Sequence, residues 1–313
     1  MLRFAPLNLS VCLLLCTLAC GATHDAPAVA GAGGAPSEAN ADAAGSGSTL
    51  SAGATGQTES FAGSGGVGPA QAGTASGLGG TAAAGAPGVA SGGAGVSLLV
   101  FSRTAAYRHD SIPAGVQALI KLAADRGWQL AATEDASRFS DMGLAAYNAV
   151  IFLSTTGDVL DDPQQAAFER FIRAGKGFIG IHSATDTEYD WAWYGALVGA
   201  YFREHPAVQA ADVVVEDPLN PASAGLPNPW RRSDEWYAFQ RNPRPDVHVL
   251  LSLDESSYAA GSANMNGDHP IAWCHEYDGG RAFYTALGHT SESFADPLFI
   301  AQLAGAVTWV LTR

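Results

Sequence analysis

Lys176–Thr187 has the sequence KGFIGIHSATDT and contains the clearest strand signal of this chain. Its apolar part, Gly177–Ile181, is a short run that begins with a glycine and has a second glycine inside it. A short apolar run of this kind is typical of a buried parallel strand. The run stops at His182, so this histidine is expected at the carboxyl end of the strand. Ligands of open α/β sheets bind at that edge. The residues leave two interpretations of His182 open, a site residue or a buried structural histidine bonded to a backbone carbonyl.

The chain before Lys176 alternates between apolar runs and amphipathic stretches. The apolar runs predict strands at Val96–Phe101, Trp128–Thr133 and Asn148–Leu153. Helices are expected at 111–127, with Ser111 as its cap and Pro113 in its first turn, and at 161–175, with Asp161 or Asp162 as its cap. Strands and helices at this spacing predict βαβ units, and therefore a parallel sheet covered on both faces.

The second half of the chain is less regular. Helices are expected at Trp191–Val198 and Pro297–Leu311, a loop at Pro218–Pro229, and strands at Asp212–Glu216, Trp236–Phe239, Val247–Leu253, Pro270–Tyr277 and Arg281–Leu287. The last two strands are separated by Asp278-Gly279-Gly280, a signal for a tight hairpin. Antiparallel strands are therefore expected on this side of the sheet.

Residues 1–20 are predicted to be a signal peptide. One basic residue, Arg3, precedes the apolar run Val11–Ala19, which is too short to span a bilayer. Cys20 follows a small residue and precedes Gly21, a pattern that resembles a bacterial lipoprotein cleavage site, so Cys20 is the expected lipidation site. Ordinary signal-peptidase cleavage is the alternative. We expect an exported protein, located in the periplasm or, as a lipoprotein, at the outer membrane or cell surface.

Residues 21–95 are mostly Ala, Gly, Ser and Thr, and they are predicted to form a disordered linker because they offer little apolar surface to bury. Residues 96–313 remain as one domain. Without Arg3 and the linker's four acidic residues, the 16 basic and 30 acidic residues of the chain become 15 and 26, a net charge of −11. This charge disfavours nucleic acid and anionic membrane surfaces as partners, which leaves a lipid anchor as the expected membrane contact. Cys274 is the domain's single cysteine, so no internal disulfide is expected.

Polar residues gather where the expected strands end. They form clusters at Arg103/Tyr107/His109, Thr155–Asp158, His182–Asp186 and Gly288–Thr290, with two more at His205-Pro206 and Asp234–Tyr237. Convergence of several loops on one edge is what a site on this architecture requires. Each cluster alone is weak evidence, because single histidines and loop carboxylates are more often structural or solvated.

An ordered series of motifs resembles the ThuA-like (trehalose utilisation) family over residues 97–312. The motifs are YRHDSI (107–112), TTGD (155–158), GFIGIHSA (177–184), HP (205–206), DEWY (234–237) and GRAFYTALGH (280–289). The resemblance implies a class I glutamine amidotransferase-like fold, which is a flavodoxin-like α/β three-layer sandwich. The expected sheet is mostly parallel, with antiparallel strands in its C-terminal part.

The comparison with amidotransferases implies a different chemistry for this chain. The nucleophilic cysteine of those enzymes lies in a Gly-x-Cys-x-Gly turn, and His182 occupies the matching position in Gly180–Ala184. Their catalytic histidine corresponds to His289. The loop Thr155–Asp158 matches the one that supplies oxyanion-hole amides in that fold. Glutamine hydrolysis through a cysteine is therefore not expected.

The family resemblance and the histidines together suggest a site for a sugar. In this hypothesis His182 and His289 act as acid/base groups. The expected sugar-binding residues are Arg103, Tyr107, His109, Thr156, Asp158, Ser183, Asp186, Glu235, Trp236 and Tyr237, together with the aromatic residues Trp191, Trp193 and Tyr194. Aromatic rings suit the apolar faces of sugars, although packing in the core explains them equally well. The alternative to proton transfer is a divalent, zinc-like metal ion near the two histidines, with His205 and Asp234 as candidate ligands and His109 and Glu235 as the alternatives to them. No histidine pair has the local spacing of a metal motif.

Three functions remain open. The leading one is an exported ThuA-like enzyme of carbohydrate metabolism that acts on trehalose, a related disaccharide or a keto-sugar. The second is a surface-tethered sugar-binding module without catalysis, and the third is a metal-dependent hydrolase. A small-molecule carbohydrate is the expected partner, and the oligomeric state does not follow from the sequence.

Overall fold

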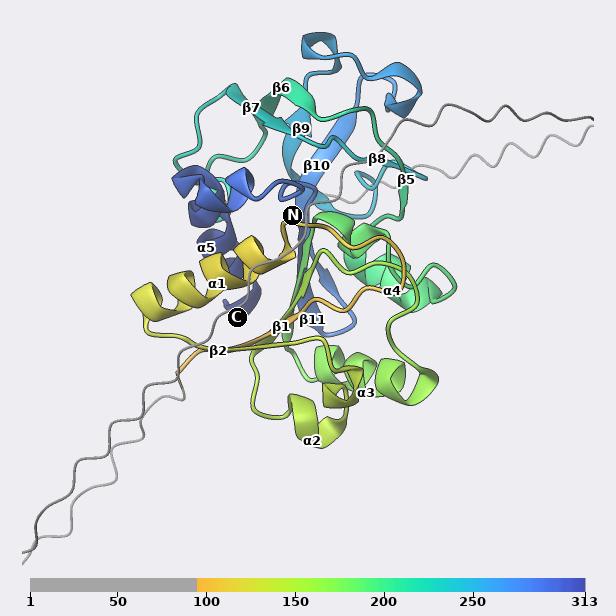
Figure 1. The fold of residues 1–313 in the computed structure, drawn as a ribbon, viewed down its shortest axis with the longest axis vertical. Helices are drawn as coiled ribbons and strands as arrows, with labels where there is room; N and C mark the ends of the chain where they lie inside the picture. Colours follow the sequence, from red (N-terminus) through yellow and green to blue (C-terminus); the bar gives the residue numbers. More distant parts are fainter. Residues whose placement is uncertain (1–94, 313) are drawn as a thin grey trace, which may run out of the picture. The chain divides into compact units, whose positions relative to one another are not determined.

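The computed structural model describes residues 95–312. The predicted signal peptide, Cys20 and nearly all of the predicted linker lie outside these residues. The centre of the described part is a nine-stranded sheet with the order β2-β1-β3-β4-β11-β10-β9-β6-β7 (Figure 1). Within residues 95–312, no helix combines the length and the apolar character needed to cross a bilayer.

One half of the sheet is parallel, as the sequence predicts. It contains β1 (Ser97–Phe101), β2 (Gln129–Thr133), β3 (Ala149–Leu153) and β4 (Gly177–Ile181), and β4 also pairs in parallel with β11 (Gly280–Thr285). Every residue of β3 and β4 is buried. These two strands are continuous apolar runs because helices cover both of their faces.

The other half of the sheet is antiparallel, which confirms the hairpin prediction. It contains β10 (His269–Tyr277), β9 (His248–Leu253), β6 (Gln209–Val215) and β7 (Trp230–Asp234). Because direction alternates from β11 to β7, strand β7 runs the same way as β11 and β4. A separate two-stranded sheet pairs β5 (Phe202–Glu204) with β8 (Ala238–Phe239).

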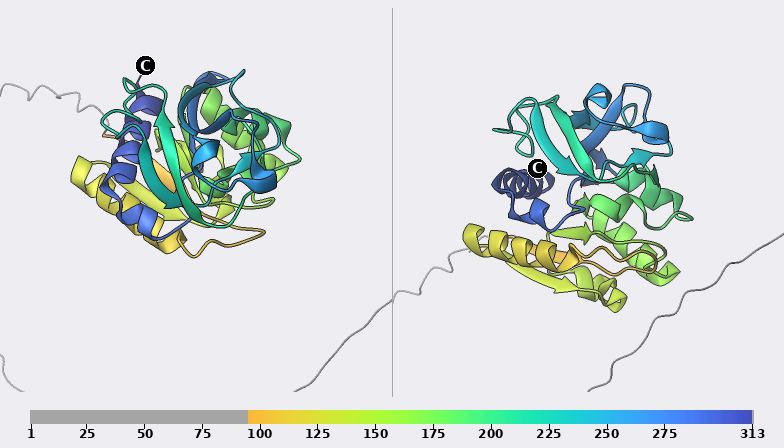
Figure 2. Two further views of the ribbon diagram at one scale, coloured as in Figure 1. Left: turned by 90° about the horizontal axis from the view of Figure 1, so that it is seen from above. Right: turned by 45° about the horizontal axis from the view of Figure 1, so that its top comes forward.

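The helices form two outer layers (Figures 1 and 2). Helices α1 (Ile112–Arg126) and α5 (Pro297–Leu311) pack on one face of the sheet, and α3 (Asp162–Arg173) and α4 (Ala192–Val198) on the other. The short α2 (Asp141–Leu144) packs on α3. Five 3₁₀ turns lie at 136–138, 182–185, 255–257, 261–263 and 292–295. The three-layer α/β class predicted from the sequence is confirmed.

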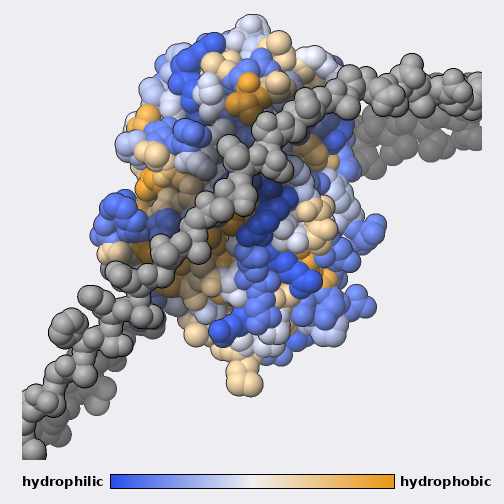
Figure 3. Space-filling view, viewed as in Figure 1, coloured by the Kyte–Doolittle hydropathy of each residue, from blue (hydrophilic) through white to orange (hydrophobic). Residues whose placement is uncertain are grey.

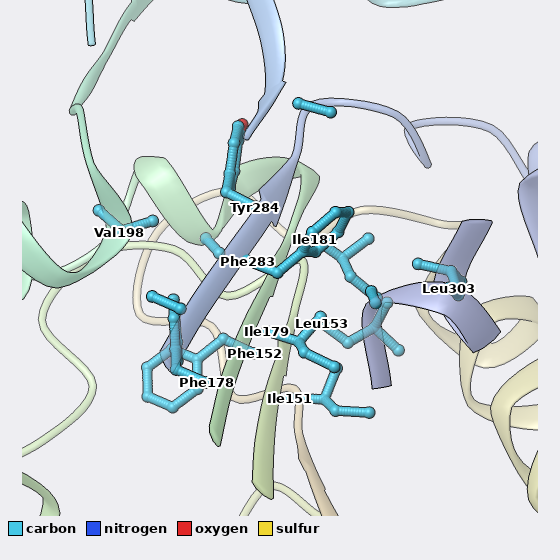
Figure 4. Packing of buried hydrophobic residues seen from close by; sticks show 14 of the residues in the cluster. Ile151, Phe152, Leu153, Phe178, Ile179, Ile181, Val198, Phe283, Tyr284 and Leu303 are labelled. Carbon is cyan, nitrogen blue, oxygen red and sulfur yellow. The ribbon is translucent and has the colours of Figure 1, made fainter. Parts of the chain in front are cut away.

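The apolar core lies on both sides of the central strands. Figure 4 shows Ile179 and Ile181 of β4 directed toward Leu303 of α5, whereas Phe178 points to the opposite side. Burying a side chain of this size stabilises the fold by roughly 1.5–3 kcal/mol. The core therefore holds the strands whose carboxyl ends carry the site. On the surface, polar and apolar residues are interspersed over the face seen in Figure 3.

Three local predictions need correction. Strand β7 was not predicted, because polar residues occupy most of its positions. The strand predicted at Trp236–Phe239 is reduced to the two residues of β8. Ser111 does not cap α1 through its side chain; its hydroxyl donates to the carbonyl of Gly288 at 3.1 Å instead. At α3, Asp161 is the capping residue of the two candidates.

Candidate functional site

His182 is the first residue after β4 and lies at the centre of the site. Its backbone is left-handed, with φ 53°, so the chain turns sharply where the strand ends. The side chain is 0% exposed. Nδ1 lies 2.9 Å from the carbonyl oxygen of Ala286. Because a carbonyl oxygen only accepts, Nδ1 of the neutral ring carries the proton and Nε2 presents its lone pair to the site.

Three further side chains converge on Nε2 of His182. It lies 3.1 Å from Nε2 of His109, 3.2 Å from Nδ1 of His289 and 3.5 Å from Oε2 of Glu235. The same carboxylate oxygen lies 3.0 Å from Nδ1 of His289. One ligand atom from each of the four residues lies within 4.8 Å of the other three. Three imidazole nitrogens and a carboxylate oxygen are a donor set for a first-row divalent metal ion.

Strand direction brings these four residues together. His109 follows β1, His182 follows β4, His289 follows β11 and Glu235 follows β7. All four strands run in the same direction, so their carboxyl ends lie at the same edge of the sheet. Gly288, just before His289, has φ 111°, a conformation that strains other residues and that lets the chain turn back toward the cluster.

The residues of the cluster shift one another's pKa values. Burial, followed by the neighbouring His182 and His289, lowers the pKa of His109 to about 3. Burial raises the pKa of Glu235, but its bonds with His182 and His289 outweigh burial and lower the pKa to about 2. Burial lowers the pKa of His289, but Glu235 outweighs it and the net pKa is raised. Near neutral pH His109 is therefore neutral and Glu235 ionised, the forms in which they bind metals.

The spacing of the ligand atoms fits a small cation. With metal–ligand distances of about 2.1 Å, neighbouring ligand atoms are about 3.0 Å apart in an octahedron and about 3.4 Å apart in a tetrahedron. Of the six separations among the four ligand atoms, the four given above are 3.0, 3.1, 3.2 and 3.5 Å, and none exceeds 4.8 Å. The Ala286 carbonyl holds the far side of the His182 ring, and Ser183 Oγ lies 3.4 Å from Nδ1 of His109. Such partners fix the orientation of metal-binding histidines.

A cavity of about 340 Å³ opens above the cluster. It is lined by Tyr107, His109, Asp186, Phe202, His205, Glu235, Tyr237 and His289. The His182 ring lies beneath it, with its centroid 4.3 Å from that of Tyr237. Nδ1 of His205 lies 3.0 Å from Oε1 of Glu235, which links this half-exposed histidine to the cluster. Asp186 accepts a hydrogen bond from the Tyr189 hydroxyl at 2.7 Å, yet burial is the larger influence and raises its pKa.

Two other cavities carry no comparable chemistry. The larger, about 650 Å³, lies at the opposite edge of the sheet, where its lining includes Asn148, Lys176 and Gly280 at the amino ends of β3, β4 and β11. It brings together no group of metal-binding side chains. The other, about 330 Å³, is lined by acidic residues that include Asp158 and Glu188. The cavity above His182 is therefore the candidate functional site.

The structure gathers most of the predicted site residues but leaves others apart. The cluster and its cavity include His182, His289, His109, Glu235, Tyr107, Asp186, Tyr237 and His205, and Ser183 contacts His109. Arg103 is exposed outside the cavity lining. The Thr156 hydroxyl donates to the Tyr107 carbonyl at 2.7 Å, and Asp158 lines the neighbouring acidic cavity.

The predicted tryptophans and one candidate metal ligand also lie outside the cavity. Trp236 is fully buried and donates its indole N–H to the carbonyl of Gln209. Trp191 stacks on Trp193 and on Tyr194, Tyr194 stacks on Phe152, and both tryptophans contact Phe168 edge-on or tilted, so packing accounts for them. Asp234 is fully buried, and its carboxylate is occupied by other hydrogen-bond donors. The cluster therefore contains His109 and Glu235, together with His182 and His289, in place of His205 and Asp234.

One cavity residue, Phe202, was not predicted from the sequence. This residue lies on β5, a strand of only three residues, which is too short to show a hydrophobic pattern that predicts a strand. The Ala286 carbonyl and the Ser111 hydroxyl were also missed, because their partners are far away in the sequence. His109 and Glu235 were predicted as sugar-binding residues and as alternatives to His205 and Asp234 near a metal ion. The structure places His109 and Glu235 against His182.

Solved structures of other proteins share the fold of this chain. A ThuA-like protein from Bacteroides uniformis ATCC 8492 is 25% identical, with a TM-score of 0.60 over 70% of this chain and 92% of the other. A ThuA-like protein from Parabacteroides merdae ATCC 43184 is 18% identical, with a TM-score of 0.59 over 70% and 90%. A cytoplasmic protein from Salmonella typhimurium LT2 is 10% identical, with a TM-score of 0.50 over 69% and 99%. Among curated proteins, none matches this chain.

The family assignment rests on the sequence and agrees with these structures. The model of the ThuA family, described as trehalose utilisation, matches residues 97–310. This range includes all four residues of the cluster and all residues that line the cavity above it. The match covers more than half of the chain, and the chain belongs to the ThuA (trehalose utilisation) family.

Proposed function

We propose that this protein is a metal-dependent enzyme that acts on an unphosphorylated carbohydrate in the cavity above His182. The observation that carries the proposal is the convergence of His109, His182, Glu235 and His289. His182 lies below the cavity, whereas the other three line it, so an ion held among them has an open side. Catalytic metal sites keep such an open position, whereas structural zinc sites are closed. Family membership links the chain to carbohydrate use.

Because three histidines and one glutamate form a set of metal ligands, we assign the histidines the role of ligands. These residues would hold a divalent ion, which would supply Lewis-acid chemistry toward a sugar oxygen or a water molecule. His182 then serves as a ligand rather than as the acid/base group suggested by the sequence, because its ring is fully buried and its proton-bearing nitrogen is bonded to Ala286. His289 has the same role at the cavity wall.

The walls of the cavity suit a sugar ring. The rings of Tyr237 and Phe202 lie 4.2 Å apart and offer apolar surface for one face of a pyranose. Within the described residues the Tyr237 hydroxyl forms no hydrogen bond, and burial raises its pKa, which keeps it protonated as a donor. Asp186 is an acceptor for sugar hydroxyl groups. A volume of about 340 Å³ is at the small end of the range for ligand sites, which suits one ring of a disaccharide.

The charge of the lining supports a substrate without phosphate. None of the eight residues around the cavity is lysine or arginine, the residues that normally bind phosphate. Asp186 and Glu235 add negative charge instead. In the metal-free protein, sugar phosphates and sugar acids should therefore bind more weakly than the corresponding neutral sugars; a bound divalent ion would offset the two carboxylates.

Metal binding is the first test of the proposal. Chelator-treated protein is titrated with Mn²⁺, Co²⁺, Ni²⁺ and Zn²⁺, and the bound metal is measured by calorimetry and elemental analysis. We expect one ion per chain in the wild type and none at comparable affinity in H182A. H248A is the matched control, because His248 is an exposed histidine that pairs with Asp217 outside the site. Failure of all four metals to bind the wild type would refute the proposal.

Turnover is the second test. The metal-loaded and chelator-treated proteins are incubated with trehalose, related disaccharides and their keto forms, and the products are separated by chromatography. We expect a product only when the metal is present. Sugar binding without any product, in both preparations, would favour the non-catalytic binding module instead.

A further inference from the structure

Asp234, the last residue of β7, is the most heavily bonded carboxylate near the cluster. Oδ1 accepts the backbone N–H groups of Glu235 at 3.0 Å and His289 at 3.1 Å. Oδ2 accepts the N–H of Gly288 at 3.1 Å, the hydroxyl of Ser293 at 2.9 Å and Nη2 of Arg232 at 3.1 Å. A carboxylate offers about four lone-pair positions, so five donors leave none for a metal ion.

The donors come from the two segments that must meet for the cluster to form. Glu235 follows β7, and Gly288 and His289 follow β11, which is separated from β7 by three strands in the sheet. No backbone ladder joins the ends of these two strands. One buried carboxylate is the shared acceptor for both, and bonds to an ionised acceptor are shorter and stronger than neutral ones.

We propose that Asp234 is the positioning residue of the metal site, which holds His289 and Glu235 at the separation that an ion requires. This inference rests on the proposed function above. Nδ1 of His289 lies 3.0 Å from Oε2 of Glu235. Asp234 fixes this separation because its carboxylate holds the backbones of both residues. Groups that orient metal ligands in this way typically change metal affinity when they are altered.

Arg232 offsets the free-energy cost of burying the negative charge of Asp234. Its side chain is 7% exposed, and its guanidinium bonds Asp234 through Nη2 and Asp296 through Nη1, the latter at 3.3 Å. It also lies over the rings of Trp230 and Phe299, at 4.5 and 5.4 Å from their centroids. Asp296 thus shares the arginine with Asp234 but contacts neither ligand segment. This difference provides a matched control.

The test replaces each carboxylate with the amide of the same size. In Asp234→Asn, one of the two oxygens becomes an NH₂ group that faces two or three donors, so the bonds to one ligand segment are lost. In Asp296→Asn only the partner of Arg232 changes, and asparagine still caps α5 in place of the aspartate. Chelator-treated wild type, D234N and D296N are titrated with Co²⁺, and the visible absorption bands, which report coordination geometry, are recorded with the affinity.

We expect D234N to bind Co²⁺ about 10–100-fold more weakly than the wild type, with shifted bands, while D296N matches the wild type. Circular dichroism and thermal unfolding establish that both variants are folded. A folded D234N with the wild-type affinity and spectrum would overturn the inference. If D234N does not fold, S293A replaces it: this variant removes one donor to Oδ2 and should shift the bands, and an unchanged spectrum overturns the inference.

The outcomes separate the two proposals. A wild-type protein that binds no Co²⁺ refutes the metal site itself, and the positioning role of Asp234 with it. A wild type that binds Co²⁺ beside a D234N that binds it identically refutes the positioning role alone. Equal weakening in D234N and D296N also refutes it, because the effect would then come from the charge of Arg232 rather than from the ligand segments.

Discussion

Replacing His109 with asparagine should make the metal-free protein less sensitive to acid. The fold lowers the pKa of His109 from 6.5 to about 3, chiefly through burial. Between these values the unfolded chain binds a proton that the native protein does not. The contribution of a histidine with a lowered pKa is therefore complete above pH 6.5, and it is lost progressively as the pH falls toward 3.

The size of the effect follows from the width of this window. One pH unit inside it costs about 1.4 kcal/mol of unfolding free energy, so His109 should account for a loss of about 2–3 kcal/mol between pH 6.5 and 4.5. The fold lowers the pKa of Glu235 from 4.5 to about 2. The stability that Glu235 contributes to the protein is therefore lost mainly below pH 4.5, outside the window of His109. His289 has a raised pKa, so its stabilisation is complete below pH 6.5 and adds no slope there.

The assay is urea unfolding of chelator-treated protein at pH 6.5, 5.5 and 4.5, followed by tryptophan fluorescence. H109N is compared with the wild type and with H248N, in which an exposed histidine changes. The pH slope is compared rather than the stability at one pH, because H109N also loses contacts at every pH. His269 and His275, whose pKa values are also lowered, contribute equally to all three proteins. Equal slopes in H109N and the wild type would refute the reasoning.

Three further predictions concern ligands and the residues near them. Zn²⁺ at 100 times its Kd should stabilise the wild type by about 2.7 kcal/mol, which raises Tm by about 5–11 °C in a domain of this size; H182A should show no such shift in a melting experiment. Y237F should keep the metal affinity of the wild type but bind a sugar about 10-fold more weakly, because one hydrogen bond of about 1.4 kcal/mol is lost; equal sugar affinities by calorimetry would remove the hydroxyl from the site. In chelator-treated protein, a neutral disaccharide should raise Tm more than its 6-phosphate does, and the reverse order would contradict the charge argument for the cavity.

Much of the scaffold was predictable from the sequence for simple physical reasons. Strands β3 and β4 are buried on both faces, so they appear as continuous apolar runs that cannot be mistaken for loops. Helix α3 carries its start signal in Asp161 and Pro163. His182 was placed correctly at the end of a strand because the apolar run stops there. These features depend on neighbours in the sequence, which a single chain displays directly.

The composition of the cluster was not predictable in the same way. The other three members of the cluster lie far from His182 in the sequence: His109 is 73, Glu235 53 and His289 107 positions away. No local sequence motif therefore indicates that these residues are in contact. The decisive strand is β7, whose polar residues conceal it although it delivers Glu235 to the site edge.

Asp234–Tyr237 shows where the sequence reaches its limit. The four residues are polar or aromatic and looked equally suited to a site, but neighbouring side chains on an extended segment point in opposite directions. Asp234 and Trp236 are fully buried behind the site, whereas Glu235 and Tyr237 line the cavity. The sequence by itself determined which residue types were present and where the strands of the parallel half end. Only the tertiary structure decided which side of β7 faces His182, because that depends on how a strand with no apolar pattern of its own packs against the rest of the sheet.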